Sequence, residues 1–421
     1  MSSKESREFD IIVLGASGFT GQFITEELAR SAPKEGIKWA ISGRNREKLS
    51  QVLITATKET GIELSDIAII EADVQSDESL RAMTGRTRLV LNAVGPYCLL
   101  GEPVVKACIL TATNHMDISG ENKYIETLYS KYDNLAKEKG IYLISTCGYD
   151  CIPNDIGVQY LKKHFPGDIN EVESYMKINA GNKGFVINWG TWKSMIHGFD
   201  VIDELKRLTT PKQMTDSKFK LRSKNLPFVD NYTDGWCLRF PGSDQSVVQR
   251  TQQYRYEKFN ERPTQIDVYF SYPNIFILIG VMLLAVVFTL LSMCRWGRSL
   301  LESYPEIFSF GTHTKTGPTR QQLKDITCKT TLVGKGWSEK LVDPSDEPSV
   351  PPNVTTVVVF EGKDPGYTVT STCLVQSGIT LIKEFDKLPK NGGVLTPGSA
   401  FSDTGIYDRL KANGISIEII K

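Results

Sequence analysis

Three glycines near the start of the chain have the spacing of a phosphate-binding turn. In the stretch FDIIVLGASGFTGQFI, which begins at Phe9, an apolar run leads into Gly15, Gly18 and Gly21, and a second apolar run follows. A strand that ends in glycines just before a helix can hold a pyrophosphate, because the helix N-terminus offers unpaired N–H groups and a positive partial charge. Gly15 would allow the tight turn, Gly18 the approach of phosphate, and Gly21 the packing of helix on strand.

The spacing GxxGxxG is a variant of the commoner GxGxxG, so the glycines alone could be an ordinary turn. Their place after a strand, at the opening of a βαβ unit, favours a dinucleotide site. We expect the cofactor to be bordered by residues of this loop and of the ends of the next strands: Ser17, Phe19, Thr20, Ser42, Arg44, Asp73, Asn92, Val94 and Gly95.

The second strand indicates which dinucleotide is bound. NAD sites usually place Asp or Glu at the end of this strand to hold the ribose hydroxyls. Here the strand ends in AISGRNREK, without an acid, and Arg44 follows at once. A guanidinium at this point can pair with a 2′-phosphate. The sequence therefore favours NADP(H) over NAD(H), while Arg46 and Lys48 are read as a solvated helix face.

Three clusters offer a proton donor for hydride transfer, which needs a positioned acceptor and usually an acid. They are Tyr97 after the fourth strand, Asp150 in CGYDCIPND, and Lys193 in GTWKS. The structural alternatives are a packed aromatic, a helix N-cap and a surface lysine. The four histidines are scattered and no cysteines form a CxxC pair, so we predict no metal site.

The elements that must position these residues change character near residue 148. Strand and helix patterns alternate up to there, which predicts a Rossmann-type, doubly wound parallel sheet over residues 1–148. Residues 149–421 are predicted as an α+β domain with a mostly antiparallel sheet. Its expected strands are 171–181, 246–259, 264–272, 326–337 and 353–368, followed by helices at 368–384 and 404–414 and a strand at 415–420.

Residues 275–294 form an uncharged apolar stretch, IFILIGVMLLAVVFTLLSMC. As a helix it is about 30 Å long, which matches the hydrocarbon core of a bilayer. A true span would put residues before and after it on opposite sides, although both are expected in one sheet. We therefore hypothesise that the stretch dips into one leaflet or a lipid-droplet monolayer, with both flanks cytosolic; a span and a buried core helix are the alternatives.

The amino-acid composition limits the classes of partner and of cellular location that remain. Lys plus Arg and Asp plus Glu are 49 each, so the formal net charge is zero and no nucleic-acid surface is indicated. The first residues, MSSKESREFD, lack the apolar core of a signal peptide, so we expect a cytosol-facing rather than a secreted protein. The eight cysteines are then expected to be reduced.

Together the motifs resemble the saccharopine dehydrogenase-like oxidoreductases, in the form of an animal member. The motifs are GASGFTGQ, SGRNREKL, NAVGPY, GEPVVKAC, DISGE, GYDCIPND, GTWKS and GGVLTPGSAF. The resemblance covers nearly the whole chain. It implies a nicotinamide domain, a mixed-sheet second domain and a reductase acting on or near lipids, since some bacterial relatives are described as trans-acting enoyl reductases.

The motifs and the resemblance lead to three hypotheses, each for a different class of function. The favoured one is an NADP(H)-dependent oxidoreductase of a hydrophobic or lipid-linked substrate at a membrane or lipid-droplet surface. The second is a saccharopine-type amino-acid reductase, for which Arg239, Arg250 and Arg255 are the candidate carboxylate ligands. The third is a membrane-surface scaffold that keeps the nucleotide fold without turnover. A homodimer is left open.

Overall fold

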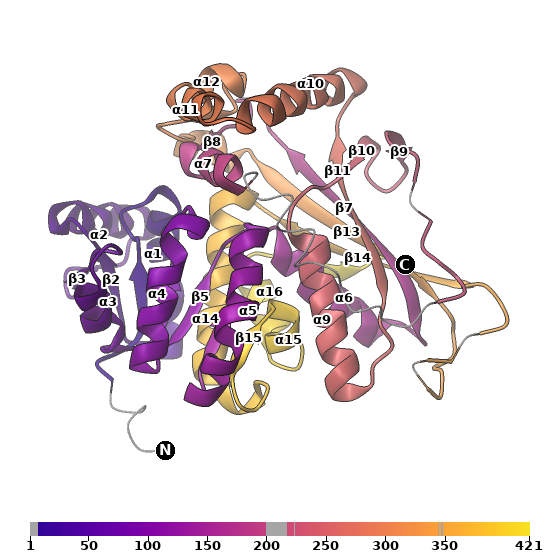
Figure 1. Cartoon of the computed structure of the whole chain (residues 1–421), viewed down its shortest axis with the longest axis horizontal. Coiled ribbons are helices and arrows are strands. Elements are labelled where there is room, and N and C mark those ends of the chain that lie inside the picture. Colours follow the sequence, from indigo (N-terminus) through magenta and orange to yellow (C-terminus); the bar gives the residue numbers. More distant parts are fainter. Residues whose placement is uncertain (1–6, 199–216, 223, 344, 347) are drawn as a thin grey trace. The chain divides into compact units, whose positions relative to one another are not determined.

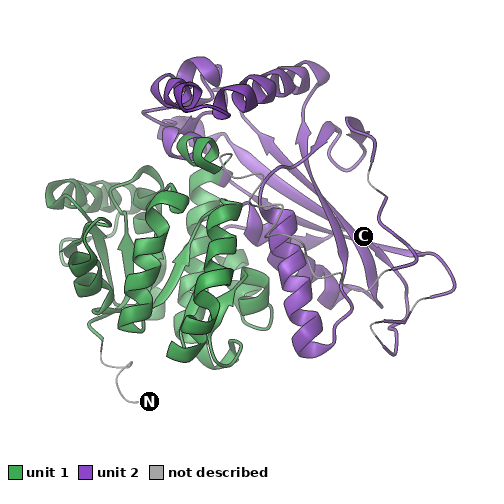
Figure 2. Cartoon of the chain, in the orientation of Figure 1, with its two compact units in different colours: residues 1–149, 193–198, 366–413 green, residues 150–192, 199–365, 414–421 purple. Residues whose placement is uncertain are grey.

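The structure, a computed structural model, describes residues 7–198, 217–222, 224–343, 345–346 and 348–421. The chain forms two compact units, which are coloured separately in Figure 2. Unit 1 comprises residues 1–149, 193–198 and 366–413, and unit 2 comprises residues 150–192, 199–365 and 414–421.

Unit 1 contains a seven-stranded sheet with the order β15-β6-β5-β4-β1-β2-β3. Its strands are β1 (Phe9–Leu14), β2 (Trp39–Gly43), β3 (Ala68–Glu71), β4 (Thr87–Asn92), β5 (Asn114–Asp117), β6 (Tyr142–Ile144) and β15 (Gly393–Leu395). Every pair in it is parallel. The order reverses between β1 and β4, which is the arrangement of doubly wound nucleotide-binding sheets. The predicted Rossmann-type fold is confirmed.

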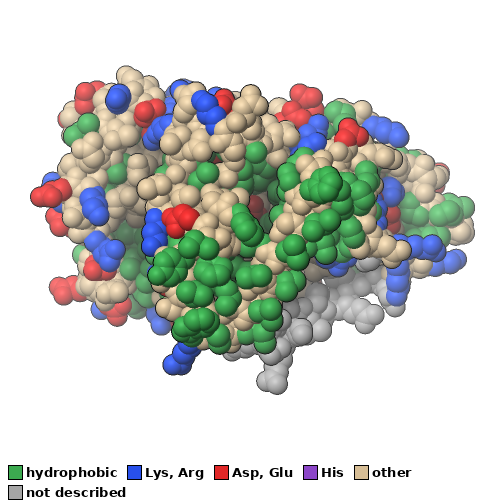
Figure 3. All heavy atoms as spheres, turned by 90° about the horizontal axis from the view of Figure 1, so that it is seen from above, with side chains coloured by type: hydrophobic (Ala, Val, Ile, Leu, Met, Phe, Trp, Pro, Cys, Tyr) green, Lys and Arg blue, Asp and Glu red, His purple; other side chains and the backbone are tan. Residues whose placement is uncertain are grey.

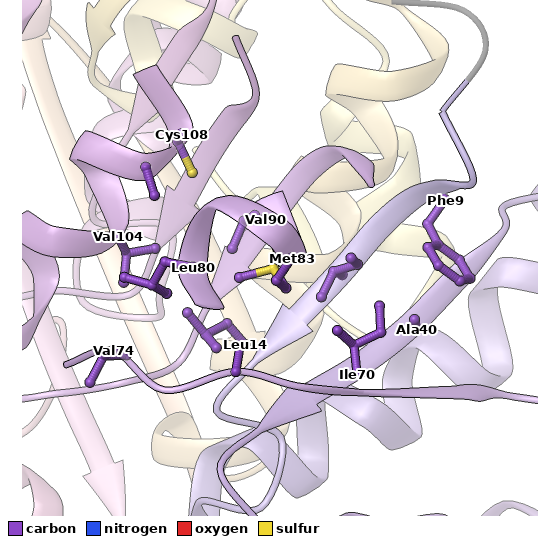
Figure 4. Close-up of a cluster of buried hydrophobic side chains, with 13 residues drawn as sticks. Phe9, Leu14, Ala40, Ile70, Val74, Leu80, Met83, Val90, Val104 and Cys108 are labelled. Atoms are coloured by element: carbon purple, nitrogen blue, oxygen red, sulfur yellow. The ribbon is translucent and has the colours of Figure 1, made fainter. Parts of the chain in front are cut away.

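The helices of unit 1 connect and cover these strands. They are α1 (Phe19–Glu35), α2 (Arg46–Thr60), α3 (Asp77–Thr84), α4 (Tyr97–Thr111), α5 (Asn122–Lys139), α14 (Thr370–Lys383), α15 (Pro397–Phe401) and α16 (Ile406–Ala412). Figure 4 shows the core cluster in which Leu14 of β1, Ile70 of β3, Leu80 of α3 and Val104 of α4 come together. This buried contact fixes the strand ends from which the site is built.

Residues 366–413 belong to unit 1, although they follow most of unit 2 in the chain (Figure 2). α14 contacts α1 and β4, and β15 pairs with β6. The Gln376 amide of α14 donates to Glu27 Oε1 (3.0 Å) and Ser31 Oγ (2.9 Å) of α1. The two units are therefore discontinuous, whereas the sequence prediction placed all of 149–421 in one continuous domain.

Unit 2 contains a mixed seven-stranded sheet with the order β16-β14-β13-β7-β11-β10-β9. Its strands are β7 (Ile169–Asn179), β9 (Phe228–Asp230), β10 (Gly235–Arg239), β11 (Gln265–Tyr272), β13 (Thr327–Gly336), β14 (Val354–Gly362) and β16 (Ser416–Ile419). Only β7 and β11 pair in parallel, and all the other pairs are antiparallel. α6 (Cys151–His164) packs on β13 and β14.

The prediction of a strand at 246–259 is wrong, because these residues lie in α9 (Asp244–Phe259). The buried positions of this helix follow a step of three to four residues: Asp244, Val247, Val248, Thr251, Gln252 and Arg255. Four of these six buried residues are polar, so the hydrophobic pattern did not reveal the helical period.

Unit 2 also carries a helical region that Figure 1 labels α10 (Ile275–Ser292), α11 (Arg295–Ser303) and α12 (Pro305–Phe308). It is followed by a two-stranded sheet of β12 (His313–Thr314) with β8 (Ile187–Asn188). α7 (Trp189–Gly198) and α13 (Arg320–Lys324) complete the described helices near these strands. Within the described residues, α10 is the one helix long and apolar enough to cross a membrane by length and composition.

Candidate functional site

The three glycines in the loop between β1 and α1 differ in why a glycine is needed. Gly15 has a φ of +86°, and a Cβ there would lie 2.7 Å from Val94 Cγ2. At Gly21 a Cβ would lie 2.2 Å from the backbone oxygen of Gly15. Gly15 is thus needed for the turn, and Gly21 for the close packing of α1 on the strand end, as the spacing predicts.

Gly18 differs from the other two because the space beside it is open. It caps α1 with φ −70° and ψ 164°, a conformation that any residue adopts. A Cβ on it would meet only the backbone oxygen of Gly15, at 3.1 Å. The first amides of α1 have no partner within the helix, as in every α-helix. This open helix N-terminus at the switch point between β1 and β4 fits a pyrophosphate.

The end of β2 adjoins this loop. Gly15 N–H donates to the backbone oxygen of Ser42 at 2.9 Å, and Ala16 N–H donates to it at 3.2 Å. The hydroxyl of Ser42 is buried without a hydrogen-bond partner in the described part of the chain. A buried hydroxyl without a partner is costly. A ligand hydroxyl or phosphate at this point would satisfy it, so the residue fits the predicted cofactor site.

Arg44 and Arg46 differ in their contacts with other residues. Arg46 Nη1 lies 4.0 Å from Glu71 Oε1 and donates to the backbone oxygen of Ile69 at 3.4 Å. Arg44 is exposed, and within the described residues it makes neither a hydrogen bond nor an ion pair. Its guanidinium is therefore available to a 2′-phosphate, and the surface role expected for Arg46 is consistent with its contacts.

The remaining loop residues have local contacts. The Phe19 ring packs edge-on against Tyr367, with 4.6 Å between ring centroids, so the side chain faces protein. Ser17 and Thr20 are half-buried. Asp73 holds its own turn after β3, where its Oδ1 accepts from Gln75 N–H at 3.0 Å.

Hydrogen bonds fix the conformation of the chain at the end of β4. Asn92 is buried, and its Oδ1 accepts from Val94 N–H at 3.0 Å. The Tyr97 hydroxyl donates to the backbone oxygen of Asn92 at 2.9 Å. Gly95 between them is exposed. These bonds fix the turn that we predict to border the nicotinamide ribose.

Tyr97 itself is suited to positioning. Burial, aided by the charge of Asp117, raises the pKa of Tyr97 well above its usual value. Its backbone N–H donates to Glu121 Oε1 at 2.9 Å, while that of Cys98 donates to Glu121 Oε2 at 2.7 Å. A phenol that is buried, weakly acidic and already bonded to a carbonyl is a poor proton donor. The geometry therefore favours the structural alternative for Tyr97, a packed aromatic side chain, over the role of proton donor.

A buried polar chain continues from Asn92 across the ends of β5 and β6. Asn92 Nδ2 lies 3.3 Å from His115 Nε2, and His115 Nδ1 lies 3.8 Å from Asp117 Oδ2. Burial lowers the pKa of His115 to about 3. Burial also raises the pKa of Asp117 to about 6, against the hydrogen bond from Ser145 Oγ at 2.5 Å. At neutral pH a neutral imidazole therefore lies beside a carboxylate, without a hydrogen bond between His115 Nδ1 and Asp117 Oδ2.

Sequence reasoning assigned no role to His115, Asp117 or Glu121. Their signal lies in the segment HMDISGE, where polar residues stand at and just after the end of a short buried strand. Glu121 caps the N-terminus of α4 through the two N–H groups that it accepts. A carboxylate at a helix N-terminus is favourable.

Lys193 is half-buried on α7 and lies in the part of that helix that belongs to unit 1. The next residue, Ser194, approaches the turn after β4: its Oγ would be 3.7 Å from a Cβ on Gly95. The motif GTWKS therefore brings a hydroxyl to the end of β4. Lys193 is the residue just before Ser194 in the sequence.

Asp150 lies in unit 2, at the start of α6. Asn154 Nδ2 donates to the backbone oxygen of Asp150 at 2.9 Å and to Asp244 Oδ1 at 2.5 Å. Although Asp150 reaches solvent, loss of water around it raises the pKa of its carboxyl to about 6. Burial, followed by the charge of Asp150, raises the pKa of Asp244. Asp150 is therefore close to the pKa that a general acid needs at neutral pH.

The arginines considered for substrate carboxylates have internal partners. Arg239 Nη2 lies 3.1 Å from Asp267 Oδ1, and Arg255 Nε donates to Glu261 Oε2 at 2.7 Å. Arg250 is half-buried. Among the residues that the structure describes, no group of three His, Cys, Asp or Glu could hold a metal ion.

Comparisons with known proteins agree with this geometry. Residues 11–144 match the family of the saccharopine dehydrogenase NADP binding domain. A Rattus norvegicus protein named saccharopine dehydrogenase-like oxidoreductase is 39% identical over 430 residues, which cover 99% of this chain and 98% of the relative. A Caenorhabditis elegans protein named lipid droplet localized protein is 35% identical over 421 residues, with 98% of both covered.

A solved structure shows the same fold. Saccharopine dehydrogenase (L-Glu forming) from Saccharomyces cerevisiae superposes with a TM-score of 0.56 over 98% of this chain and 100% of the other. The two sequences are 13% identical, so the likeness concerns the fold alone.

Proposed function

The chain belongs to the saccharopine dehydrogenase-like oxidoreductases, and from this we propose that it is an NADPH-dependent reductase of a hydrophobic or lipid-linked substrate at a lipid surface. The family and its NADP-binding domain make the protein an oxidoreductase that uses NADP(H). The observation that carries the proposal further is the open helix N-terminus at Gly18, together with the guanidinium of Arg44, which follows the neighbouring strand β2 and has no partner within the described chain.

In this proposal each part of unit 1 has a distinct task. The N-terminus of α1 holds the pyrophosphate and Arg44 holds the 2′-phosphate. The turn from Asn92 to Gly95 borders the nicotinamide ribose, and Tyr97 and Glu121 keep that turn in place. The bound NADPH supplies the hydride. Ser194, close to Gly95, orients the reacting end of the substrate or the carboxamide of the cofactor.

Asp150 is the proton donor that we favour. A carboxyl with a pKa near 6 keeps a fraction of its protons at neutral pH and can transfer one to the reduced substrate. Asp244 supports this role, because it is buried and two neighbouring carboxyls cannot both ionise easily. Lys193 is the second choice, while Tyr97 is assigned to positioning.

A hydrophobic substrate is supported by two observations. The arginines that an amino-acid reductase would need, Arg239 and Arg255, are paired with Asp267 and Glu261. The relative named for lipid droplets covers 98% of this chain. We therefore place the protein at a cytosol-facing membrane or lipid-droplet surface, with the amino-acid reductase and the scaffold as alternatives.

The experiment uses NADPH that carries deuterium at C4 of the nicotinamide. The purified full chain is incubated with this cofactor and either a lipid extract or a water-soluble metabolite extract, and products are searched for deuterium by mass spectrometry. Deuterium in a lipid supports the proposal. Deuterium in an amino acid would establish the amino-acid reductase instead, and NADPH binding without transfer in either extract would favour the scaffold.

A matched variant shows whether the transfer comes from this site. Asp150→Asn keeps the size of the side chain and leaves the backbone oxygen that accepts from Asn154, but it has no acidic proton to give. We expect it to bind NADPH as the wild type does and to lose about 100-fold in rate of deuterium transfer. An unchanged rate would remove Asp150 from the mechanism.

A further inference from the structure

The surface of α10, α11 and the turn after α12 is strongly apolar. Figure 3, seen from above, looks at the side where Figure 1 labels these helices and shows hydrophobic side chains gathered in broad patches. The large apolar residues of this segment that are between 44% and 81% exposed are Phe276, Ile277, Ile279, Met282, Leu283, Val286, Val287, Leu290, Met293, Trp296, Tyr304, Ile307 and Phe310. We call this set the apolar platform.

We propose that the apolar platform inserts flat into one leaflet of a lipid surface, with α10 parallel to the surface. The inference deepens the proposed function, on which it rests, by naming the surface that brings the enzyme to a lipid substrate. A platform of this kind exceeds the single exposed hydrophobic residues that soluble proteins carry.

One side of α10 is already used by the protein along its whole length. Leu278, Phe288 and Ser292 are buried, and Ile275, Val281, Leu284 and Leu291 are half-buried. These positions recur every three or four residues, so they form one stripe of the helix. Phe288 packs against Trp192 at 4.9 Å between ring centroids. The helix therefore lies along unit 2, and only its opposite side can meet lipid.

The chain on both sides of α10 returns to the same sheet. β7 and β11 come before α10, whereas β13 comes after it, and β13 pairs with β7 over ten residue pairs. If α10 crossed a bilayer, β13 and β7 would lie on opposite sides and could not pair. The fold thus excludes a span that keeps this sheet and favours insertion from one side.

The far end of the platform has the residues of a membrane interface. α11 begins at Arg295, and its Gly297 packs closely on the end of α10, since a Cβ there would lie 2.1 Å from the backbone oxygen of Leu291. Trp296 and Arg295 are exposed there, and Arg295 has no ion-pair partner in the described chain. Trp and Arg are favoured at the level of the headgroups, where one end of the side chain is apolar and the other is wet.

A lipid leaflet fits the platform better than a second copy of the chain does. From Ile275 to Met293 the exposed side carries no charge. The one exposed hydroxyl, that of Thr289, is bonded to the backbone oxygen of Ala285 at 2.7 Å. A protein partner would find almost no polar group to bond, whereas hydrocarbon needs none.

Flotation with phosphatidylcholine vesicles tests the partner. The variant Phe276→Gln, Leu283→Gln, Leu290→Gln keeps helix formers on α10 but removes three large exposed side chains. The matched control, Ile54→Gln, Leu110→Gln, Leu135→Gln, changes three exposed apolar residues on the helices of unit 1. We expect the floating fraction to fall at least tenfold in the first variant only, while both bind NADPH normally.

Three results would overturn the inference. They are equal flotation of the platform variant and the wild type, no flotation of the wild type, and a wild-type dimer that the platform variant converts to monomer without any vesicle binding. Because NADPH binding is measured on the same samples, a failure of the platform is distinguishable from a failure of the nucleotide site.

The flat orientation of α10 is tested by measuring how deep labelled positions of the helix lie in the bilayer. A Cys294→Ser background removes the exposed thiol, and Ser keeps the N-cap of α11. Cys98, which is half-buried, is replaced by Ser in the same background so that it cannot carry the label. Cysteines placed singly at 276, 283 and 290 then carry a fluorophore that brominated lipids quench.

We expect the three labels to lie at the same depth in the outer leaflet. Positions 276 and 290 are about 21 Å apart along a helix axis. A label at 283 that is deeper than both others, with one end in the inner leaflet, would establish a span and refute the inference.

Discussion

The substitution Gly18→Val separates binding from folding at the cofactor loop. Gly18 has φ −70° and ψ 164°, so valine needs no strained backbone. The nearest atom to the new Cβ is the backbone oxygen of Gly15 at 3.1 Å, which has to move by only a few tenths of an ångström. We expect the free energy of unfolding to change by no more than about 1 kcal/mol.

The effect on binding is larger because the valine methyls fill the space in front of the helix N-terminus. A displaced pyrophosphate loses at least two hydrogen bonds from backbone N–H groups, each of about 1.5–3 kcal/mol when one partner is charged. The loss of about 3 kcal/mol or more corresponds to a Kd for NADPH that is at least ~100-fold weaker. Isothermal titration calorimetry with NADPH and urea unfolding of the same samples give both numbers.

Gly21→Val is the matched control, because here the new Cβ would lie 2.2 Å from Gly15 O and 2.8 Å from Ala16 Cα. Both atoms belong to the backbone, so α1 has to move away from the strand end. We expect a loss of about 1–3 kcal/mol in stability. Our account of the loop is refuted if Gly18→Val binds NADPH within fivefold of the wild type, or if it unfolds as readily as Gly21→Val.

Three further predictions concern other residues. Arg44→Ala should weaken NADPH binding by roughly 10- to 150-fold and leave NADH binding unchanged in calorimetry, because a hydrogen bond to a phosphate contributes about 1.5–3 kcal/mol; equal losses for both cofactors would remove Arg44 from the 2′-phosphate site. The pKa of His115 is lowered to about 3 in the fold, so the unfolded chain binds the extra proton first and stability falls as pH decreases from about 6.5. Protonation of Asp117, whose pKa is raised to about 6, opposes part of this loss. His115→Asn should therefore lose less stability than the wild type between pH 7.5 and 5 in urea titrations, and parallel curves would contradict the burial argument. Trp192→Ala should cost about 3–5 kcal/mol, because its buried ring contacts Phe288 and its Nε1–H donates to the backbone oxygen of Leu301 at 3.0 Å; proteolysis should then cut near α10 first, and a resistant variant would show that α10 is held by other contacts.

The sequence predicted the strands within residues 7–144 well, because most of the buried strands there are short apolar runs between turn residues. The exception is β5, which is buried although three of its four residues are polar. Gly15 and Gly21 have the backbone reasons that their spacing indicated. Contact of the cofactor with these residues stays a prediction. In unit 2 the helix at Asp244–Phe259 was missed, since its buried stripe includes Thr251 and Gln252 and does not resemble an apolar face.

The sequence could not predict which distant segments meet. The pattern of residues 368–384 indicated a helix, yet nothing in it shows that this helix, α14, packs on α1 in unit 1. The same holds for the pairing of Asn92 with His115, which depends on β4 and β5 being neighbours in the sheet. Hydrophobic patterns report that a residue is buried, while sheet order decides what it is buried against.

The return of residues 366–413 to unit 1 has a consequence for synthesis on the ribosome. When residue 149 has emerged, β6 still lacks β15 and β4 lacks the cover of α14, which is buried along nearly all its length. At about 5–20 residues per second, the roughly 200 intervening residues take on the order of 10 to 40 s to be made. During that time the nascent nucleotide-binding sheet exposes an open strand edge and apolar surface, which are the features that chaperones recognise and that cause aggregation. The cofactor domain, whose first strand is β1, is therefore complete only after residue 413 has been made.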